Sequence, residues 1–186
     1  LYNKAKASEE HATEQLAAAE TEKAYLETVL DSVTRAQSYT DVAEIRDELA
    51  EGGYITRNTS KKKKFQKKSQ PMEFTSSDGY TILIGRNNKQ NDELTIKMSY
   101  STDIWMHTKN IPGSHTLIRT NGQSENDIPD RTIVEAAELA AYFSKARSGT
   151  GIAVDYTQVK NIRKPNGSKP GFVIYEANYT VYVTPD

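Results

Sequence analysis

Residues 103–122 read DIWMHTKNIPGSHTLIRTNG, and the fold is best worked out from this stretch. In a β-strand, Trp105, His107 and Lys109 would lie on one side, because successive side chains point to opposite faces. Pro112-Gly113-Ser114 favours a turn, and residues 115–120 have the composition of a second strand. A hairpin of the two strands would gather five side chains able to contact a ligand: Trp105, His107, Lys109, His115 and Arg119.

The composition is that of a polar protein without disulfide or thiolate chemistry, because the 186 residues include no Cys. A reducing cytoplasm is consistent with this composition. No apolar run approaches the roughly 20 residues that span a bilayer, so we expect no membrane span. The chain begins with Leu, and we therefore expect it to be part of a longer protein.

The formal net charge of -1 hides a strong asymmetry along the chain. Residues 1–51 carry a charge of about -7, residues 52–70 about +7, and the remainder is close to neutral. A basic segment can bind polyanions locally whatever the total charge.

We divide the chain into a helical coiled-coil region at 1–55, a polybasic linker at 56–71 and a domain at 72–186. Residues 1–37 contain neither Gly nor Pro and space their apolar side chains by three, four or seven, which predicts a helix that needs a partner. That partner would lie upstream or in another chain. A short second helix, capped by Thr40 or Asp41, would fold back on the first helix. The apolar face of this second helix would consist of Val42, Ile45 and Leu49. The linker fits either a flexible tether or a nucleic-acid contact.

For residues 72–186 we predict an α+β fold, with a mixed, mainly antiparallel sheet, one long helix and one short helix. A hairpin would turn at Ser77-Asp78-Gly79, and Asn91 would cap the short helix. The long helix would run over residues 131–147 with an apolar face of Val134, Ala137, Ala141 and Phe143. Further predictions are a strand at 152–159, a basic loop at 161–171, and a closing hairpin of 172–175 with 179–183.

Three chemistries fit the polar residues of this domain. A metal hydrolase would use His107 and His115 beside Asp103 or Asp155, but no metal-ligand spacing is present. Nucleophilic catalysis would need the side chains of Ser114 and His115 to meet. On a strand, however, adjacent side chains point to opposite faces. RNA binding requires aromatic and cationic side chains, which the domain supplies in number. RNA binding is therefore favoured, while core packing is the alternative for Trp105.

Four motifs carry a family resemblance: GRNNKQND (85–92), DIWMHTKNIPGSH (103–115), EAAELAAYFSKAR (135–147) and VDYTQVKNIRKPNGSKPGFVIY (154–175). They resemble the NFACT-R domain, the C-terminal RNA-binding module of the family that includes bacterial fibronectin-binding protein A, or RqcH, and eukaryotic NEMF. The likeness covers about residues 72–186. Residues 1–55 resemble the family's coiled-coil region.

The resemblance implies a cytoplasmic, non-enzymatic module that binds tRNA and, through its coiled coil, the rRNA and protein of the large ribosomal subunit. In the family, tRNA is recruited for template-free alanine tailing of stalled nascent chains, and the ribosome supplies the peptidyl-transfer site. The alternative is a surface-displayed adhesin fragment that binds fibronectin. Self-association through the arm is a further expectation, whereas no cofactor, metal or catalytic residue is expected. We do not expect the family's N-terminal NFACT domain or its helix-hairpin-helix segment within these residues, and we therefore expect no elongation activity from this chain alone.

The resemblance and the local charge together predict the RNA-facing residues. They are Arg86, Asn87, Asp103, Trp105, His107, Lys109, His115, Arg119, Lys160, Arg163 and Lys164.

Overall fold

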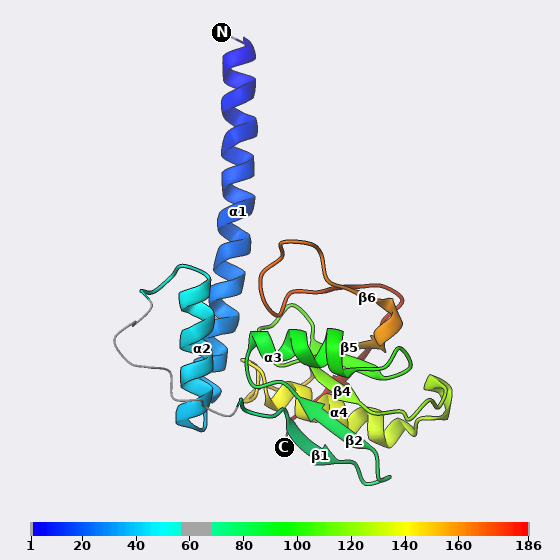
Figure 1. The fold of residues 1–186 in the computed structure, drawn as a ribbon. Coiled ribbons are helices and arrows are strands. Elements are labelled where there is room, and N and C mark those ends of the chain that lie inside the picture. Colours follow the sequence, from blue (N-terminus) through cyan, green and yellow to red (C-terminus); the bar gives the residue numbers. More distant parts are fainter. Residues whose placement is uncertain (1, 57–67, 186) are drawn as a thin grey trace.

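The computed structural model describes residues 2–56 and 68–185, which form a helical hairpin and an α+β domain (Figure 1). Helix α1 (Tyr2–Arg35) projects from the domain, and residues 4–21 of it are exposed. Helix α2 (Tyr39–Glu51) folds back on the other end of α1, as predicted. Tyr25, Val29 and Ile45 form the small core between the two helices.

The turn between α1 and α2 corrects the predicted helix cap. Ser38 is the cap, because its extended backbone lets its side chain accept a hydrogen bond from the Asp41 N–H at 3.1 Å. The Asp41 carboxylate accepts in return from the Ser38 N–H, which completes a capping box. The apolar face is also narrower than predicted, since Val42 is 48% exposed.

The domain is built on a six-stranded sheet in the order β1-β2-β4-β3-β5-β8, in which every pair of neighbours is antiparallel. The α+β class and the hairpin over residues 103–122 are confirmed. The turn at Ser77-Asp78-Gly79 is also confirmed. The strands are β1 (Met72–Thr75), β2 (Thr81–Ile84), β3 (Ile104–Thr108), β4 (Thr116–Ile118), β5 (Ile152–Gln158) and β8 (Tyr179–Val183).

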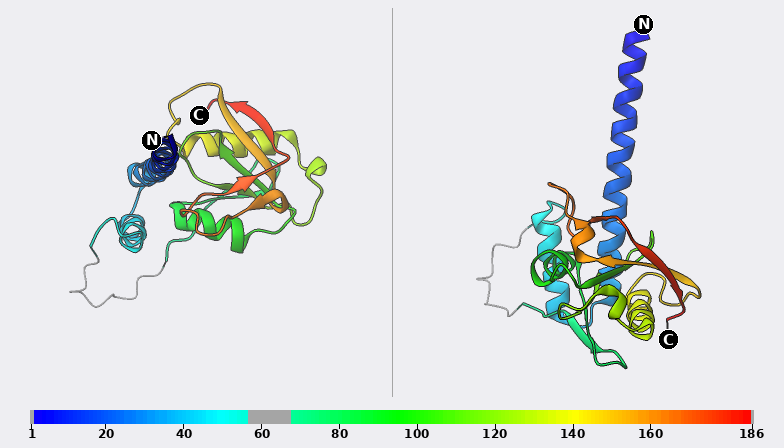
Figure 2. Two further views of the ribbon diagram at one scale, coloured as in Figure 1. Left: turned by 90° about the horizontal axis from the view of Figure 1, so that it is seen from above. Right: turned by 90° about the vertical axis from the view of Figure 1, so that its right-hand side faces the viewer.

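Helix α4 (Asp130–Tyr142) covers one face of the sheet (Figure 2). Its buried face consists mainly of small side chains at Ala136, Ala137, Ala140 and Ala141, all with no exposed surface, so the helix packs closely on the strands. Val134, predicted on this face, is instead 37% exposed.

The predicted helix over 131–147 ends five residues early. Ser144 forms a β-bridge with Gly113, and the Lys145 N–H donates to the Pro112 carbonyl at 2.8 Å. These contacts draw the chain toward the β3–β4 turn and away from the helix axis, because backbone groups bonded there are not available to continue the helix.

A second layer covers the opposite face of the sheet (Figure 2). It packs on Leu83, Trp105 and Leu117 of the strands. Asn87, and not the predicted Asn91, caps its first helix, since the Asn87 side chain accepts from the Gln90 N–H at 2.9 Å. The layer consists of α3 (Asn88–Asp92), the π-helix η1 (Glu93–Met98), the 3-10 helix η3 (Val159–Asn161), β6 (Ile162–Arg163) and β7 (Ile174–Tyr175). A further 3-10 turn, η2 (Glu125–Asp127), precedes α4.

The predicted closing hairpin is wrong. β7 pairs with β6 in the second layer, while β8 pairs with β5 at the edge of the main sheet. The Thr157 hydroxyl contacts the carbonyls of Glu176 and Ala177 at 3.3 and 3.2 Å, and Ala177 has a φ of 50°. The chain therefore crosses from one layer to the other between β7 and β8, and a local turn does not form.

Two predictions about the N-terminal region stay predictions. The polybasic linker lies mostly outside the described residues, and the coiled-coil pairing of α1 is not established by its contact with α2. None of the helices in the described residues combines the length and apolar character needed to cross a bilayer.

We predict that Ala137→Leu destabilises the domain by about 1–3 kcal/mol, because the added side chain overfills the contact between α4 and the sheet. Urea unfolding would measure this change. The same substitution at exposed Ala18 of α1 is the control and should change the unfolding free energy by less than about 0.5 kcal/mol. Equal effects at the two positions would contradict the described packing.

Candidate nucleic-acid interface

The rings of Trp105, His107 and His115 lie close together beneath the second layer, as predicted. Trp105 and His107 lie on the same side of β3, and the β3–β4 register places His115 beside them. The centroid of the Trp105 ring lies 5.9 Å from that of the His107 ring and 5.1 Å from that of the His115 ring. Trp105 is only 1% exposed, so it packs in the core. Tyr175 of β7 covers it, with the two ring centroids 4.9 Å apart.

His115 connects three segments of the domain through its ring nitrogens. Its Nε2 lies 3.0 Å from the Gly171 carbonyl and its Nδ1 lies 2.7 Å from the Thr95 hydroxyl. Because a carbonyl can only accept, Nε2 donates and Nδ1 accepts from Thr95. Burial holds the pKa of His115 well below 6.5, with a further contribution from His107. The ring is therefore neutral and structural.

The residues of the two catalytic alternatives are engaged within the fold. The Ser114 hydroxyl donates to the Gly85 carbonyl and accepts from Arg35 at 2.9 Å. His107 Nε2 lies 3.3 Å from the Gly113 carbonyl, to which it can donate. Burial lowers the pKa of His107 as well. Within the described residues, no three His, Asp or Glu side chains are grouped as metal ligands. These contacts favour structural roles for Ser114, His107 and His115.

Asp103 forms a buried anchor at one end of β3. Its carboxylate has no exposed surface and accepts from Arg119 Nη1 at 2.6 Å. The N–H groups of Tyr100 and Thr120 also donate to it, at 2.9 and 3.1 Å. The Arg119 guanidinium lies 5.2 Å from the centroid of the Tyr100 ring. Asp103 thus fixes Arg119 and the turn before β3, and its carboxylate does not face solvent.

The GRNNKQND stretch faces the helical hairpin. Asn87 is buried, and its Nδ2 donates to Glu44 of α2 at 2.9 Å. Arg86 donates to the Gln70 carbonyl at 2.9 Å and lies 3.7 Å from Asp41 of α2. Asn88 donates to Glu48 of α2 at 3.1 Å. This stretch joins the domain to the hairpin, a role that was not predicted from the sequence.

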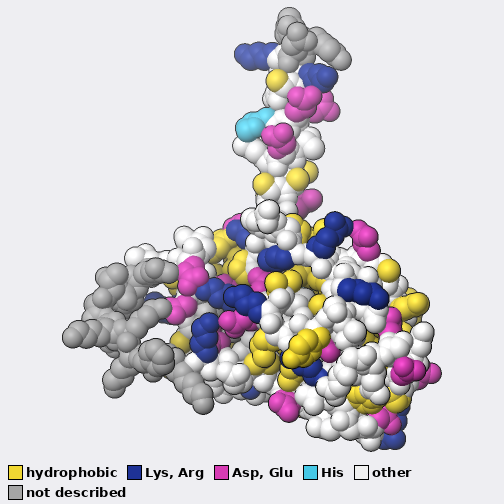
Figure 3. All heavy atoms as spheres, turned by 45° about the vertical axis from the view of Figure 1, so that its right-hand side comes forward, with side chains coloured by type: hydrophobic (Ala, Val, Ile, Leu, Met, Phe, Trp, Pro, Cys, Tyr) yellow, Lys and Arg dark blue, Asp and Glu magenta, His cyan; other side chains and the backbone are white. Residues whose placement is uncertain are grey.

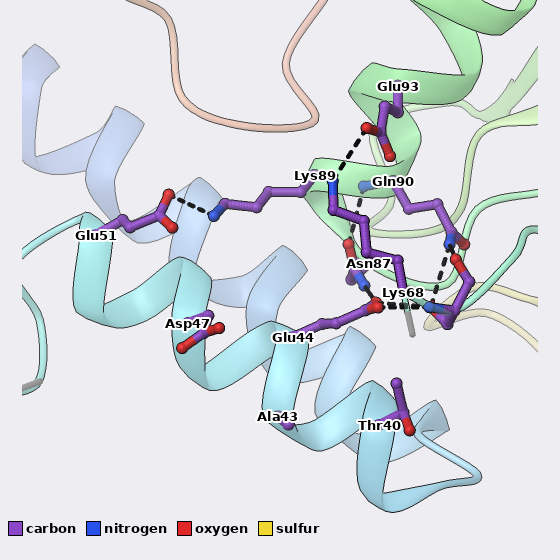
Figure 4. Close-up of a pocket in the computed structure, with 11 residues that line it drawn as sticks. Thr40, Ala43, Glu44, Asp47, Glu51, Lys68, Asn87, Lys89, Gln90 and Glu93 are labelled. Atoms are coloured by element: carbon purple, nitrogen blue, oxygen red, sulfur yellow. Dashed lines mark hydrogen bonds and ion pairs between the residues drawn. The ribbon is translucent and has the colours of Figure 1, made fainter. Parts of the chain in front are cut away.

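A cavity of about 300 Å³ lies along this contact between α2 and α3 (Figure 4). At its wall Asn87 donates to Glu44 and the Gln90 side chain donates to Ser69, while Lys89 pairs with Glu51 across it. Glu44 and Glu51 of the wall bind Asn87 and Lys89, and these two contacts join the hairpin to the domain. We therefore assign the cavity to this interdomain contact.

The remaining predicted residues divide by exposure. Lys164 is fixed internally, because its Nζ binds Asp92 at 3.0 Å and two backbone carbonyls. Lys109 lies 3.5 Å from buried Asp155 but keeps 47% of its side chain exposed. Arg163 is 67% exposed beside Glu176, and Lys160 is also exposed. Lys109, Lys160 and Arg163 are thus the predicted cations that face solvent.

Two residues make contacts that were not predicted from the sequence. Tyr100 is 69% exposed, and its position in a polar stretch just before a strand was the available signal. Lys169 binds Glu22 of α1 at 2.8 Å and lies 5.1 Å from the ring centroids of both Tyr25 and Tyr54. Lys169 is part of the basic loop, but only the folded chain brings it to α1.

Arg119→Met should lower the unfolding free energy by about 3–5 kcal/mol, because it leaves the Asp103 carboxylate buried without its cation. Urea unfolding would measure this loss. Arg131→Met is the matched control, since Arg131 forms an exposed pair with Glu135, and it should cost at most about 1 kcal/mol. Similar losses in the two variants would contradict the anchor.

Stability should also fall as the pH drops below about 6.5. In this range His115 becomes protonated in the unfolded chain but stays neutral in the folded chain, because burial lowers its pKa there. Between about pH 6.5 and about pH 5.5, the loss in the wild type should exceed that in His115→Gln by up to about 1.4 kcal/mol. Subtracting the pH profile of His115→Gln from that of the wild type cancels the contribution of the carboxylates, which both proteins share. Urea unfolding at each pH measures it, and parallel pH profiles would refute a neutral buried His115.

Two family models match successive parts of the chain. The model of the NFACT protein RNA binding domain matches residues 70–176. The model of the NFACT N-terminal and middle domains matches residues 1–68.

Individual relatives agree with this assignment. The chain is 46% identical over 187 residues to the Rqc2 homolog RqcH of Bacillus subtilis, covering 100% of this chain and 32% of the relative. It is 34% identical over 92 residues to ribosome quality control complex subunit 2 of Schizosaccharomyces pombe, covering 49% of this chain and 9% of the relative. The chain thus spans about a third of the bacterial relative.

A solved structure has the same fold. It is the C-terminal part of the fibronectin/fibrinogen-binding protein from Streptococcus suis, with a TM-score of 0.90 and 41% identity. The match covers 100% of this chain and 72% of that one. From the family models and these relatives together, the chain belongs to the NFACT family and carries its RNA binding domain.

Proposed function

We propose that this chain is the RNA-holding part of a ribosome-associated quality control factor, with tRNA and the large ribosomal subunit as its partners. The observation that carries the proposal is the match of residues 70–176 to the NFACT RNA binding domain. The similarity of the whole chain to RqcH supports the same function. In this proposal the chain is not an enzyme, acts in the cytoplasm, and contributes to alanine tailing only by positioning tRNA.

The exposed cations provide the contact with the RNA backbone. Lys109, Lys160 and Arg163 can reach phosphates, and Arg163 would exchange its exposed partner Glu176 for a phosphate at little cost. Figure 3 shows Lys and Arg side chains on the domain surface below the projecting part of α1, with Asp and Glu among them. Such a mixed surface binds RNA through particular contacts more than through a uniform field.

The buried members of the predicted set act indirectly in this proposal. Asn87, Asp103, Trp105 and His115 hold the strands, the second layer and the hairpin in place. Arg86 and Lys164 also have internal partners. The exposed part of α1 is the surface that we assign to the large ribosomal subunit, because it projects beyond the domain (Figure 1).

The experiment measures tRNA binding to the 186-residue chain as a function of salt. Affinity should fall steeply with added salt, because Lys and Arg release counterions from the phosphates they contact. Lys160→Gln with Arg163→Gln should weaken binding and reduce the slope of log affinity against log salt by about one for each residue.

The control variant is Arg46→Gln with Arg131→Gln, which removes the same charge from exposed positions on α2 and α4. It should leave the slope nearly unchanged. Equal slopes for the two double variants would reject the assigned contacts. Binding of fibronectin without measurable tRNA affinity would reject RNA binding and support the adhesin alternative.

A further inference from the structure

Tyr100 presents an exposed ring on a fixed backbone. Its side chain is 69% exposed and packs in none of the hydrophobic clusters of the described residues. The Tyr100 N–H nevertheless donates to buried Asp103 at 2.9 Å, and the Asp103 N–H donates to the Tyr100 carbonyl at 3.0 Å. The turn before β3 therefore holds the backbone of Tyr100 in place.

Arg119 also restrains the ring. Its guanidinium is bound to Asp103, which fixes its position, and lies 5.2 Å from the centroid of the Tyr100 ring. Within the part of the chain that the structure describes, Tyr100 is the exposed ring with such a cation over it. A ring with a fixed backbone and a cation over it loses less conformational entropy when a ligand stacks on it than an unrestrained ring does.

A cation lies on the neighbouring chain segment. The Lys160 N–H donates to the carbonyl of Ser101 at 3.1 Å, so Lys160 leaves the backbone beside the turn that carries Tyr100. The Lys160 side chain is exposed, and Arg163 follows it on β6. The site therefore combines one flat apolar surface with positive charge on the adjacent chain segment.

We propose that Tyr100 is a stacking site for an unpaired RNA base whose phosphate lies toward Lys160, an inference that rests on the RNA binding proposed above. A nucleotide matches both halves of the site, because its base has an aromatic face and its phosphate is anionic. An aromatic peptide side chain would use only the ring. A base inside a duplex cannot reach the ring, because both of its faces are already stacked.

The base identity is not selected by this geometry. Stacking depends on the face that every base presents, and it tolerates changes in sequence. Specificity would instead be for structure, favouring loops, bulges or single-stranded ends over a continuous helix. The rings of the Trp105 cluster cannot supply this contact, because they are covered by Tyr175 and the rest of the second layer.

The test compares two RNA probes that share one stem: a hairpin with an unpaired loop, and a blunt duplex without a loop. Tyr100→Leu should weaken binding of the 186-residue chain to the hairpin by about 5- to 100-fold, which is the loss expected for one stacked base. Binding to the blunt duplex should change by less than about twofold, because phosphate contacts remain.

Two control variants separate stacking from other effects. Tyr100→Phe keeps the ring and should retain binding to the hairpin. Tyr182→Leu removes a comparably exposed ring, at 72%, from edge strand β8 and should leave both affinities unchanged. Circular dichroism should show the same folded content in all three variants, since both tyrosines are exposed.

Each alternative result has one meaning. Equal losses on hairpin and duplex, or no loss on either, would overturn the stacking site while leaving RNA binding intact. An equal loss in Tyr182→Leu would also overturn it, because the effect would then be general to exposed rings. If the wild-type chain binds neither probe nor tRNA, the proposed function and the stacking site fall together.

Discussion

The pairing of β3 with β4 is the constraint on which both layers of the domain depend. Trp105 lies opposite Leu117, and this register sends Ile104 and Met106 to the α4 face while Trp105 and His107 face the second layer. A shift by one residue would exchange the two sets, because side chains alternate along a strand. It would also separate Asp103 from Arg119, whose ion pair is buried at the end of this hairpin.

Local patterns in the sequence were sufficient for the central hairpin and for much of the helical content. Alternation identified β3, and the spacing of apolar residues identified α1, α2 and α4. The closing hairpin could not be predicted in the same way. Residues 174–175 and 179–183 are both locally suited to strands, but their partners, β6 and β5, are set by the layers they cover. Such a choice depends on contacts between distant residues, and turn composition does not encode it.

The predicted site shows the same division between local and distant information. Residue type alone identified Lys109, Lys160 and Arg163 as exposed cations. It could not show that Asn87 binds Glu44 or that Lys164 binds Asp92, since these partners lie 43 and 72 residues away in the chain. Polar residues in a shared motif were read as ligand contacts, whereas the fold uses several of them to satisfy buried hydrogen bonds. Tyr100 was overlooked because exposure is a property of the folded chain.

The contact between hairpin and domain sets a geometric relation across the molecule. Arg35 bonds Ser114, Thr28 bonds Asn88, and Glu22 bonds Lys169, so α1 is attached at several points between residues 22 and 35. Residues 2–21 extend beyond these attachments by about 30 Å, at 1.5 Å per residue. A molecule bound to the exposed residues 4–21 of α1 and another bound to the sheet domain are therefore kept at a defined separation and orientation. Within the described residues, each residue of the helix adds about 1.5 Å to the distance between the exposed part of α1 and the sheet domain.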